Sequence, residues 1–213
     1  MVGIPTIKEQ ISIAAFLDSK TALIDQAIDI KQKQIELLKE RRQILIHKAV
    51  TRGLNPNVKM KDSGVKWIGE IPEHWEVISN KNIFKLKKNQ VGKRSGDYVL
   101  LSLTLNGVIK RDMENPQGKF PAEFDTYQEV KKGDFIFCLF DVEETPRCVG
   151  LSEFDGMITG AYTVMQSDEN FDNNFLYYYF IDIDERKRLK YLYTGLRNTI
   201  SKDNFFFIKD CYA

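Results

Sequence analysis

Apolar residues in the first quarter of the chain recur at intervals of three and four positions, the spacing of one face of a helix. Thr6-Ile7-Lys8-Glu9 has the form of a capping box, and no glycine or proline follows it until Gly53. The pattern predicts one helix within residues 1–52, about 65 Å long if continuous at 1.5 Å per residue. Asp18-Ser19 is the place where it could divide. The apolar series from residue 24 onward comprises Ile24, Ile28, Ile35, Leu38, Leu45 and Ala49.

The sequence leaves two possibilities for what this helix packs against. Its apolar stripe is wider than a strict two-helix seam, and Lys31 and Arg42 interrupt the heptad. In one interpretation the helix packs on its own globular domain. In the other it pairs antiparallel with a second such helix, because it is longer than a domain with a radius of gyration of about 14 Å. The residues predicted to pair are Ile24, Ile28, Ile35, Leu38 and Leu45.

Residues 53–75 predict a tether between the helix and a globular region. Glycine and proline punctuate this segment, which excludes a helix of any length. Trp67, Ile68, Ile71 and Trp75 are too apolar for a free linker. We therefore expect the tether to lie along a surface with its two tryptophans docked.

From residue 76 onward the period changes from that of a helix to short runs typical of strands, separated by turns. Lys132-Gly133-Asp134 predicts a turn that leads into a buried strand, and residues 175 to about 193 predict a helix. The fold class expected is therefore α+β, with a long N-terminal helix and an irregular, mainly antiparallel sheet over residues 76–213. The strands expected are 98–103, 135–140, 149–151 and 162–165.

The charge balance argues against a general polyanion binder. The net charge is +1, and residues 75–213 hold 19 Lys and Arg against 21 Asp and Glu. Any nucleic-acid contact of the globular region must therefore come from local clusters, with further affinity supplied by a partner protein.

Neither a catalyst nor a cofactor site is predicted. The sequence has no phosphate-binding Gly-x4-Gly-Lys-Ser/Thr loop, no Gly-x-Gly-x-x-Gly run and no Asn/Asp-Pro-Pro-Tyr/Phe tetrapeptide of methyltransferases. Three cysteines at unpatterned spacing, with His47 and His74, predict reduced structural thiols and no zinc site. No apolar run approaches the length of a membrane span and no signal-peptide pattern is present, so we expect a cytoplasmic protein.

A long motif links the helix to the globular region: Lys61-Asp62-Ser63-Gly64, then Trp67, Gly69, Ile71-Pro72 and Trp75. This order resembles the specificity subunit of type I restriction-modification enzymes, at the passage from a spacer helix into a target recognition domain. The resemblance continues through nearly the whole chain. Its further elements are Leu101-Ser102, Gly107-Val108-Ile109, Gly133-Asp134, Tyr162, Phe175 to Tyr179 and Gly195 to Ile200.

The resemblance implies a non-catalytic subunit that reads half of a bipartite double-stranded DNA target. It also implies methyltransferase (modification) partners, which methylate adenine, and a restriction/translocase partner. Intact chains of the family carry two recognition domains and two helices, whereas this sequence carries one of each. We therefore expect half of such a subunit, as a fragment or a truncated gene product, that forms a homodimer through its helix. The alternative is a coiled-coil assembly protein that does not read DNA.

Three clusters carry side chains suited to phosphates and base edges. The alternative for each cluster is an ordinary solvated loop, and Arg197 has a second one, in which it hydrogen-bonds the backbone of its own domain. The predicted DNA contacts are Lys87, Lys88, Asn89, Gln90, Lys93, Arg94 and Ser95 in the first cluster, Arg147 in the second, and Thr194, Arg197 and Asn198 in the third.

Overall fold

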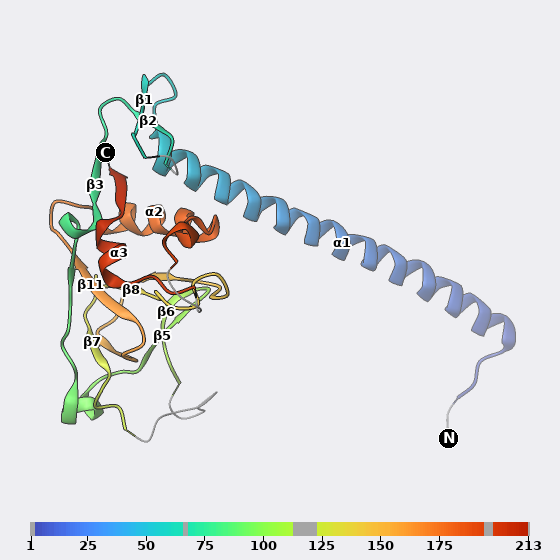
Figure 1. Cartoon of the computed structure of the whole chain (residues 1–213). Coiled ribbons are helices and arrows are strands. Elements are labelled where there is room, and N and C mark those ends of the chain that lie inside the picture. Colours follow the sequence, from blue (N-terminus) through green and yellow to red (C-terminus); the bar gives the residue numbers. More distant parts are fainter. Residues whose placement is uncertain (1–2, 66–67, 113–122, 194–197, 213) are drawn as a thin grey trace. The chain divides into compact units, whose positions relative to one another are not determined.

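The computed structural model describes residues 3–65, 68–112, 123–193 and 198–212 of the protein, with the side chains of 191 and 209–212 excepted. Two compact units are distinguished, Met1–Leu45 and Ile46–Ala213. Figure 1 follows the chain by colour through both units.

Helix α1 (Ile7–Arg52) is continuous through Asp18-Ser19, so the predicted long helix is confirmed and has no break there. Glu9 Oε2 accepts hydrogen bonds from the Thr6 backbone N–H at 2.9 Å and from the Thr6 hydroxyl at 2.7 Å. The first of these bonds satisfies a backbone donor that a helix start leaves free, as in one half of a capping box. At the other end Gly53 adopts φ +73° and its N–H donates to the Ala49 carbonyl at 3.1 Å, as expected of a glycine C-cap.

The last turns of α1 belong to the globular unit. Val50 is buried in the main core, and Ile46 packs against it. His47 Nδ1 lies 3.0 Å from a carboxylate oxygen of Asp182, which is itself buried in helix α2 (Asn173–Glu185). The histidine therefore has a structural contact here.

The tether folds into a small hairpin in which β1 (Met60–Asp62) pairs antiparallel with β2 (Glu70–Pro72). Trp75 is 3% exposed, and its ring meets that of Phe175 on α2 edge to face, with centroids 6.3 Å apart. The docking predicted for this tryptophan is confirmed, and Trp67 lies outside the described residues.

The sheets of the globular unit are small, and all pairs of named strands are antiparallel, as predicted. The central sheet has the order β4-β11-β8-β9. Its strands are β4 (Phe84–Leu86), β11 (Thr163–Ser167), β8 (Phe135–Phe137) and β9 (Val149–Leu151). The remaining pairs are β5 (Leu101–Thr104) with β6 (Gly107–Lys110), β7 (Gln128–Val130) with β10 (Gly156–Ile158), and β3 (Glu76–Ser79) with β12 (Lys209–Tyr212).

Phenylalanine rings form the centre of the core. Phe137 of β8 meets Phe180 of α2 at 5.2 Å and Phe205 of α3 (Lys202–Phe207) at 4.8 Å between ring centroids. Phe84 and Phe135 complete the group from β4 and β8. Since each ring buries a large apolar area, this group ties both helices to the central sheet.

Three predicted elements are shorter than expected. Helix α2 ends at Glu185, not near residue 193, because Lys187 turns the chain with φ +49° into a short 3₁₀ helix, η3 (Arg188–Leu192). Strand β5 begins at Leu101: a 3₁₀ helix, η2 (Gly92–Asp97), precedes it, and Leu100 forms only an isolated bridge with Met157. Strand β8 ends at Phe137, where the chain enters the loop to β9.

Candidate nucleic-acid interface

The first predicted cluster runs from the end of β4 into η2. Val91 is buried with Leu100 and Met157 in a second, smaller core. Its N–H donates to the Tyr127 carbonyl at 2.9 Å, and the Gly92 N–H donates to the Asp125 carbonyl at 3.2 Å. These contacts anchor the segment from its inner side and leave polar side chains on its outer side.

Lys88, Lys93 and Arg94 are the exposed cations of this segment. Within the described part of the chain, neither lysine has an ion-pair or hydrogen-bond partner. The Arg94 guanidinium lies over the ring of Tyr98, 6.0 Å from its centroid, so its contact is with an aromatic face. These three side chains are therefore available to phosphates or base edges.

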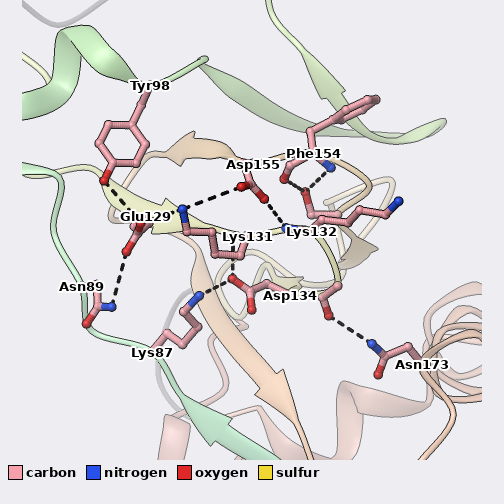
Figure 2. Close-up of polar contacts among 12 residues, drawn as sticks. Lys87, Asn89, Tyr98, Glu129, Lys131, Lys132, Asp134, Phe154, Asp155 and Asn173 are labelled. Carbon is pink, nitrogen blue, oxygen red and sulfur yellow. Dashed lines mark hydrogen bonds and ion pairs between the residues drawn. The ribbon is translucent and has the colours of Figure 1, made fainter.

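Lys87 is placed differently. Its Nζ lies 2.5 Å from an oxygen of Asp134, and the two side chains are only 17% and 4% exposed (Figure 2). The same carboxylate accepts the Lys131 backbone N–H at 2.7 Å, which closes the turn around Gly133. The pair thus joins the end of β4 to the turn before β8, and its geometry favours a structural role for Lys87.

One acidic side chain of the same region, Glu129, is half-buried and has several polar contacts. The Glu129 carboxylate accepts hydrogen bonds from the Asn89 amide at 3.4 Å and from the Tyr98 hydroxyl at 3.3 Å, and it lies 3.1 Å from the Lys131 ammonium (Figure 2). The hydrogen bond from Lys131 holds the pKa of Glu129 below its usual value.

Two polar residues of the first cluster remain. Gln90 lies exposed in an isolated bridge opposite Gln128, and Ser95 is half-buried in η2.

A depression of about 890 Å³ lies beside this cluster. Lys85, Lys87, Lys131 and Lys132 line it together with four acids, Asp134, Asp168, Glu169 and Asp172. Because the charges balance, the depression is not suited to an anion. Lys132 is nevertheless an exposed cation of this region that is not among the predicted contacts, although the Lys131-Lys132-Gly133 run could have indicated it.

Arg147 faces the interior of its own chain. The side chain is 11% exposed, with Nη2 3.6 Å from Glu185 and Nη1 3.9 Å from Asp184. Nε and Nη1 are buried and have no hydrogen-bond partner in the described part of the chain. DNA contact by Arg147 stays a prediction, and this conformation does not present its guanidinium to a ligand.

The structure brings the second and third clusters together. The Val142 N–H donates to the Asn198 carbonyl at 3.4 Å, and the Asn198 amide donates to Glu143 at 3.2 Å. Thr194 and Arg197 lie outside the described residues. Glu143 and Glu144 are exposed at this meeting point, and neither is among the contacts predicted from the sequence.

Among the described residues, no three His, Cys, Asp or Glu side chains are grouped in a way that could hold a metal ion. Cys138 and Cys148 are buried and form no disulfide, and burial raises the pKa of the Cys148 thiol. No helix in the described ranges is both long and apolar enough to cross a membrane.

The five residues predicted to pair helices lie exposed on α1 in the single chain. Their exposed fractions run from 46% at Ile35 to 64% at Leu38, and the set comprises Ile24, Ile28, Ile35, Leu38 and Leu45. Pairing through them stays a prediction.

No family model matches the chain. The putative type I restriction enzyme MjaX specificity subunit of Methanocaldococcus jannaschii is 29% identical over 206 residues, which cover 91% of this chain and 44% of that protein. The MjaVIII specificity subunit of the same organism is 32% identical over 94 residues, or 44% of this chain and 20% of that protein. The chain thus spans less than half the length of these curated relatives. The resemblance inferred from the motifs is confirmed by the matches.

The fold is similar to that of a solved chain from work on complex assembly and conformational transition of the type I R-M system. The TM-score is 0.58 at 12% identity, with 98% of this chain and 48% of that chain covered. This likeness confirms the α+β fold with its long N-terminal helix.

Proposed function

We propose that the chain, a relative of the type I restriction enzyme specificity subunits, is a non-catalytic subunit that reads one half of a bipartite DNA target. The observation that carries the proposal is the sequence similarity to the MjaX specificity subunit, which extends over 91% of this chain. In this proposal residues 1–52 are the spacer helix, 53–75 the tether and 76–213 the recognition domain.

The exposed cations of the first cluster support contact with DNA. Lys88 and Lys93 are exposed and have no acidic partner among the described residues. Each is suited to a phosphate as a flexible point charge, whereas Arg94 can present two donors to a guanine edge. Phosphate contacts would set the register of the protein on the duplex, and base contacts would supply the sequence preference.

Partners are part of the proposal, because the recognition domain is slightly acidic overall. With 19 basic against 21 acidic residues over 75–213, the domain alone should bind DNA weakly. Modification subunits, and a restriction/translocase subunit, would supply further contacts and all of the chemistry. Such a complex would act on DNA in the cytoplasm.

The alternative is a coiled-coil assembly protein; the exposed apolar residues of α1 fit it as well as they fit the recognition subunit, whereas the similarity to specificity subunits favours the recognition subunit. A helix with such a wide apolar stripe should pair in water, since contiguous exposed apolar surface usually marks an interaction site. Helix pairing fits both candidates. In a recognition subunit, a two-fold antiparallel pair would bring two recognition domains together, whereas in an assembly protein the pairing would itself be the function.

Binding to random duplexes at several salt concentrations separates the two. The chain is titrated alone and with a type I modification subunit from the same genome. If the chain is a DNA-recognition subunit, its binding to the duplexes should weaken steeply with salt and should be stronger when the modification subunit is present. Absence of salt-dependent binding in both samples would leave the assembly protein as the better account.

A further inference from the structure

The loop between β8 and β9 meets the end of α2 at the ammonium group of Lys187. This residue lies between α2 and η3, and its Nζ donates to the carbonyl oxygens of Val142 at 3.3 Å and Thr145 at 2.9 Å. A third bond goes to Asp184 Oδ1 at 3.0 Å. Because an ammonium group has three donors, all of them are used inside the protein. The loop between β8 and β9, residues 138–148, is thus folded around this cation.

Asp184 extends the same arrangement. Its side chain is 2% exposed, and the carboxylate oxygen not bound by Lys187 accepts the backbone N–H of Cys148 at 2.8 Å. Val142 lies inside the loop and Cys148 lies at its end, next to β9. The Lys187–Asp184 pair therefore holds the loop through three backbone groups, the carbonyls of Val142 and Thr145 and the N–H of Cys148.

The backbone of Lys187 is unusual. It adopts φ +49° and ψ 36°, a left-handed conformation that residues other than glycine avoid. The contacts of its side chain stabilise this conformation, which ends α2 and turns the chain toward the third predicted cluster. There the Ile200 N–H donates to the Leu139 carbonyl at 2.8 Å, at the start of the same loop.

The side chains presented at this junction suit bases better than phosphates. Glu143 is exposed and accepts the Asn198 amide at 3.2 Å, and Glu144 beside it is also exposed. Carboxylates repel phosphates, but they accept a hydrogen bond from the cytosine amino group, and asparagine pairs with an adenine edge. Arg147 lies inside, so the exposed side chains are the carboxylates of Glu143 and Glu144, with the half-buried Asn198 beside them.

We propose that Lys187 is a positioning residue for base readout. By holding the β8–β9 loop, it presents Glu143 and Asn198 together to base edges in a groove, without touching DNA itself. The proposal rests on the proposed function, because it takes this junction to face the DNA. It adds residues that are not among the DNA contacts predicted from the sequence, namely Lys187 and Asp184 as support and Glu143 as a reader.

The test uses the chain together with a modification subunit from the same genome. A library of random duplexes is selected with the wild type, and dissociation constants are measured for the enriched duplex and for a shuffled one. Lys187→Met should reduce the preference for the enriched duplex about tenfold, which corresponds to a loss of about 1.4 kcal/mol. Its affinity for the shuffled duplex should stay nearly unchanged, since the charge of Lys187 is used internally.

Lys202→Met is the matched control. Lys202 is exposed at the start of α3 and has no partner in the described part of the chain, so this change should leave the preference intact. Glu143→Gln should alter the base enriched at one position with an unchanged melting temperature. Should Lys187→Met fail to fold, Lys187→Arg replaces it. Arg keeps the charge but its planar fork cannot reach the same three acceptors, and a reduced preference is again expected.

Three results would overturn the proposal. An unchanged preference in Lys187→Met, while hydrogen exchange of the loop amides is faster, would mean that loop position does not matter. An equal loss for both duplexes would mean that Lys187 contacts phosphate directly. If the wild type enriches no sequence, the proposed function itself fails, and this inference fails with it.

Discussion

Gly53 and Trp75 lie against each other where α1 ends: a Cβ added to the glycine would be 3.5 Å from Cζ2 of the indole. That distance is ordinary van der Waals contact, so a methyl group fits. The φ of +73° at Gly53 is the true constraint, because it lies in the left-handed region. The glycine ends the helix, and the docked tryptophan holds the tether beside it.

Gly53→Ala should therefore destabilise the protein through backbone strain, by about 1 kcal/mol. Urea unfolding followed by circular dichroism measures the change. Gly96→Ala is the control, since Gly96 has no positive φ and no atom within 4 Å of the position that an added methyl group would take. Equal stability of Gly53→Ala and the wild type would contradict the capping role.

Asp134→Asn should destabilise the protein by about 3 kcal/mol, because it leaves Lys87 as a nearly buried cation without its countercharge. Thermal or urea unfolding gives the difference. Asp155→Asn is the comparison. Asp155 is exposed and lies 3.7 Å from the Lys131 ammonium, so its replacement should hardly move the unfolding midpoint. A small effect of Asp134→Asn would return Lys87 to the set of free cations.

Lys88→Ala and Lys93→Ala should each weaken binding to all duplexes alike and reduce the slope of log K against log salt by about one unit. Both lysines are exposed and unpaired in the described part of the chain. Lys87→Ala should lower stability more than it lowers the slope, because Lys87 is paired with Asp134. Titrations over a series of salt concentrations measure the slopes. Unaltered slopes for Lys88 and Lys93 would remove the first cluster from the interface.

Arg94→Ala should relax the preference at one base position, at about 1 to 3 kcal/mol, because a guanidinium can bind guanine O6 and N7 together. Methylation profiling of the reconstituted complex reports the sequence methylated and its rate. Arg147→Met is the counterpart. Since Arg147 is paired inward with Glu185 and the buried Asp184, Arg147→Met should lower the melting temperature and leave the methylated sequence unchanged. A changed target in Arg147→Met alone would reverse the roles given to these two arginines.

Replacement of Ile35 and Leu38 by Asp should yield monomers where the wild type associates, because charges on the apolar stripe of α1 oppose pairing. Light scattering at matched concentrations measures the mass. A double replacement at the exposed polar positions Lys33 and Glu40 by Ala is the control and should still associate. A monomeric wild type would disprove pairing through the helix of this chain.

The sequence by itself determined the features that depend on neighbouring residues. The capping box of Thr6 and Glu9, the glycine end at Gly53 and the turn at Gly133 are local in sequence, and each was predicted where it occurs. The long helix followed from periodicity, and β5, β8, β9 and β11 followed from short apolar runs, though with less accurate ends, whereas the other strands were not among those expected. Local hydrogen bonding and backbone preference suffice to decide such features.

The tertiary structure alone decided which polar side chains remain free. Lys87 and Lys88 are adjacent and similar in sequence, yet one is paired with Asp134, 47 residues away, and the other is exposed. Arg147 and Lys187 are directed inward by acids of α2, and the end of that helix is set by Lys187. Ion pairs between distant segments depend on the packing of the whole domain, which sequence spacing does not encode. A basic cluster in the sequence therefore indicates a candidate interface, and the burial and pairing of each side chain in the fold decide which of its residues can contact a ligand.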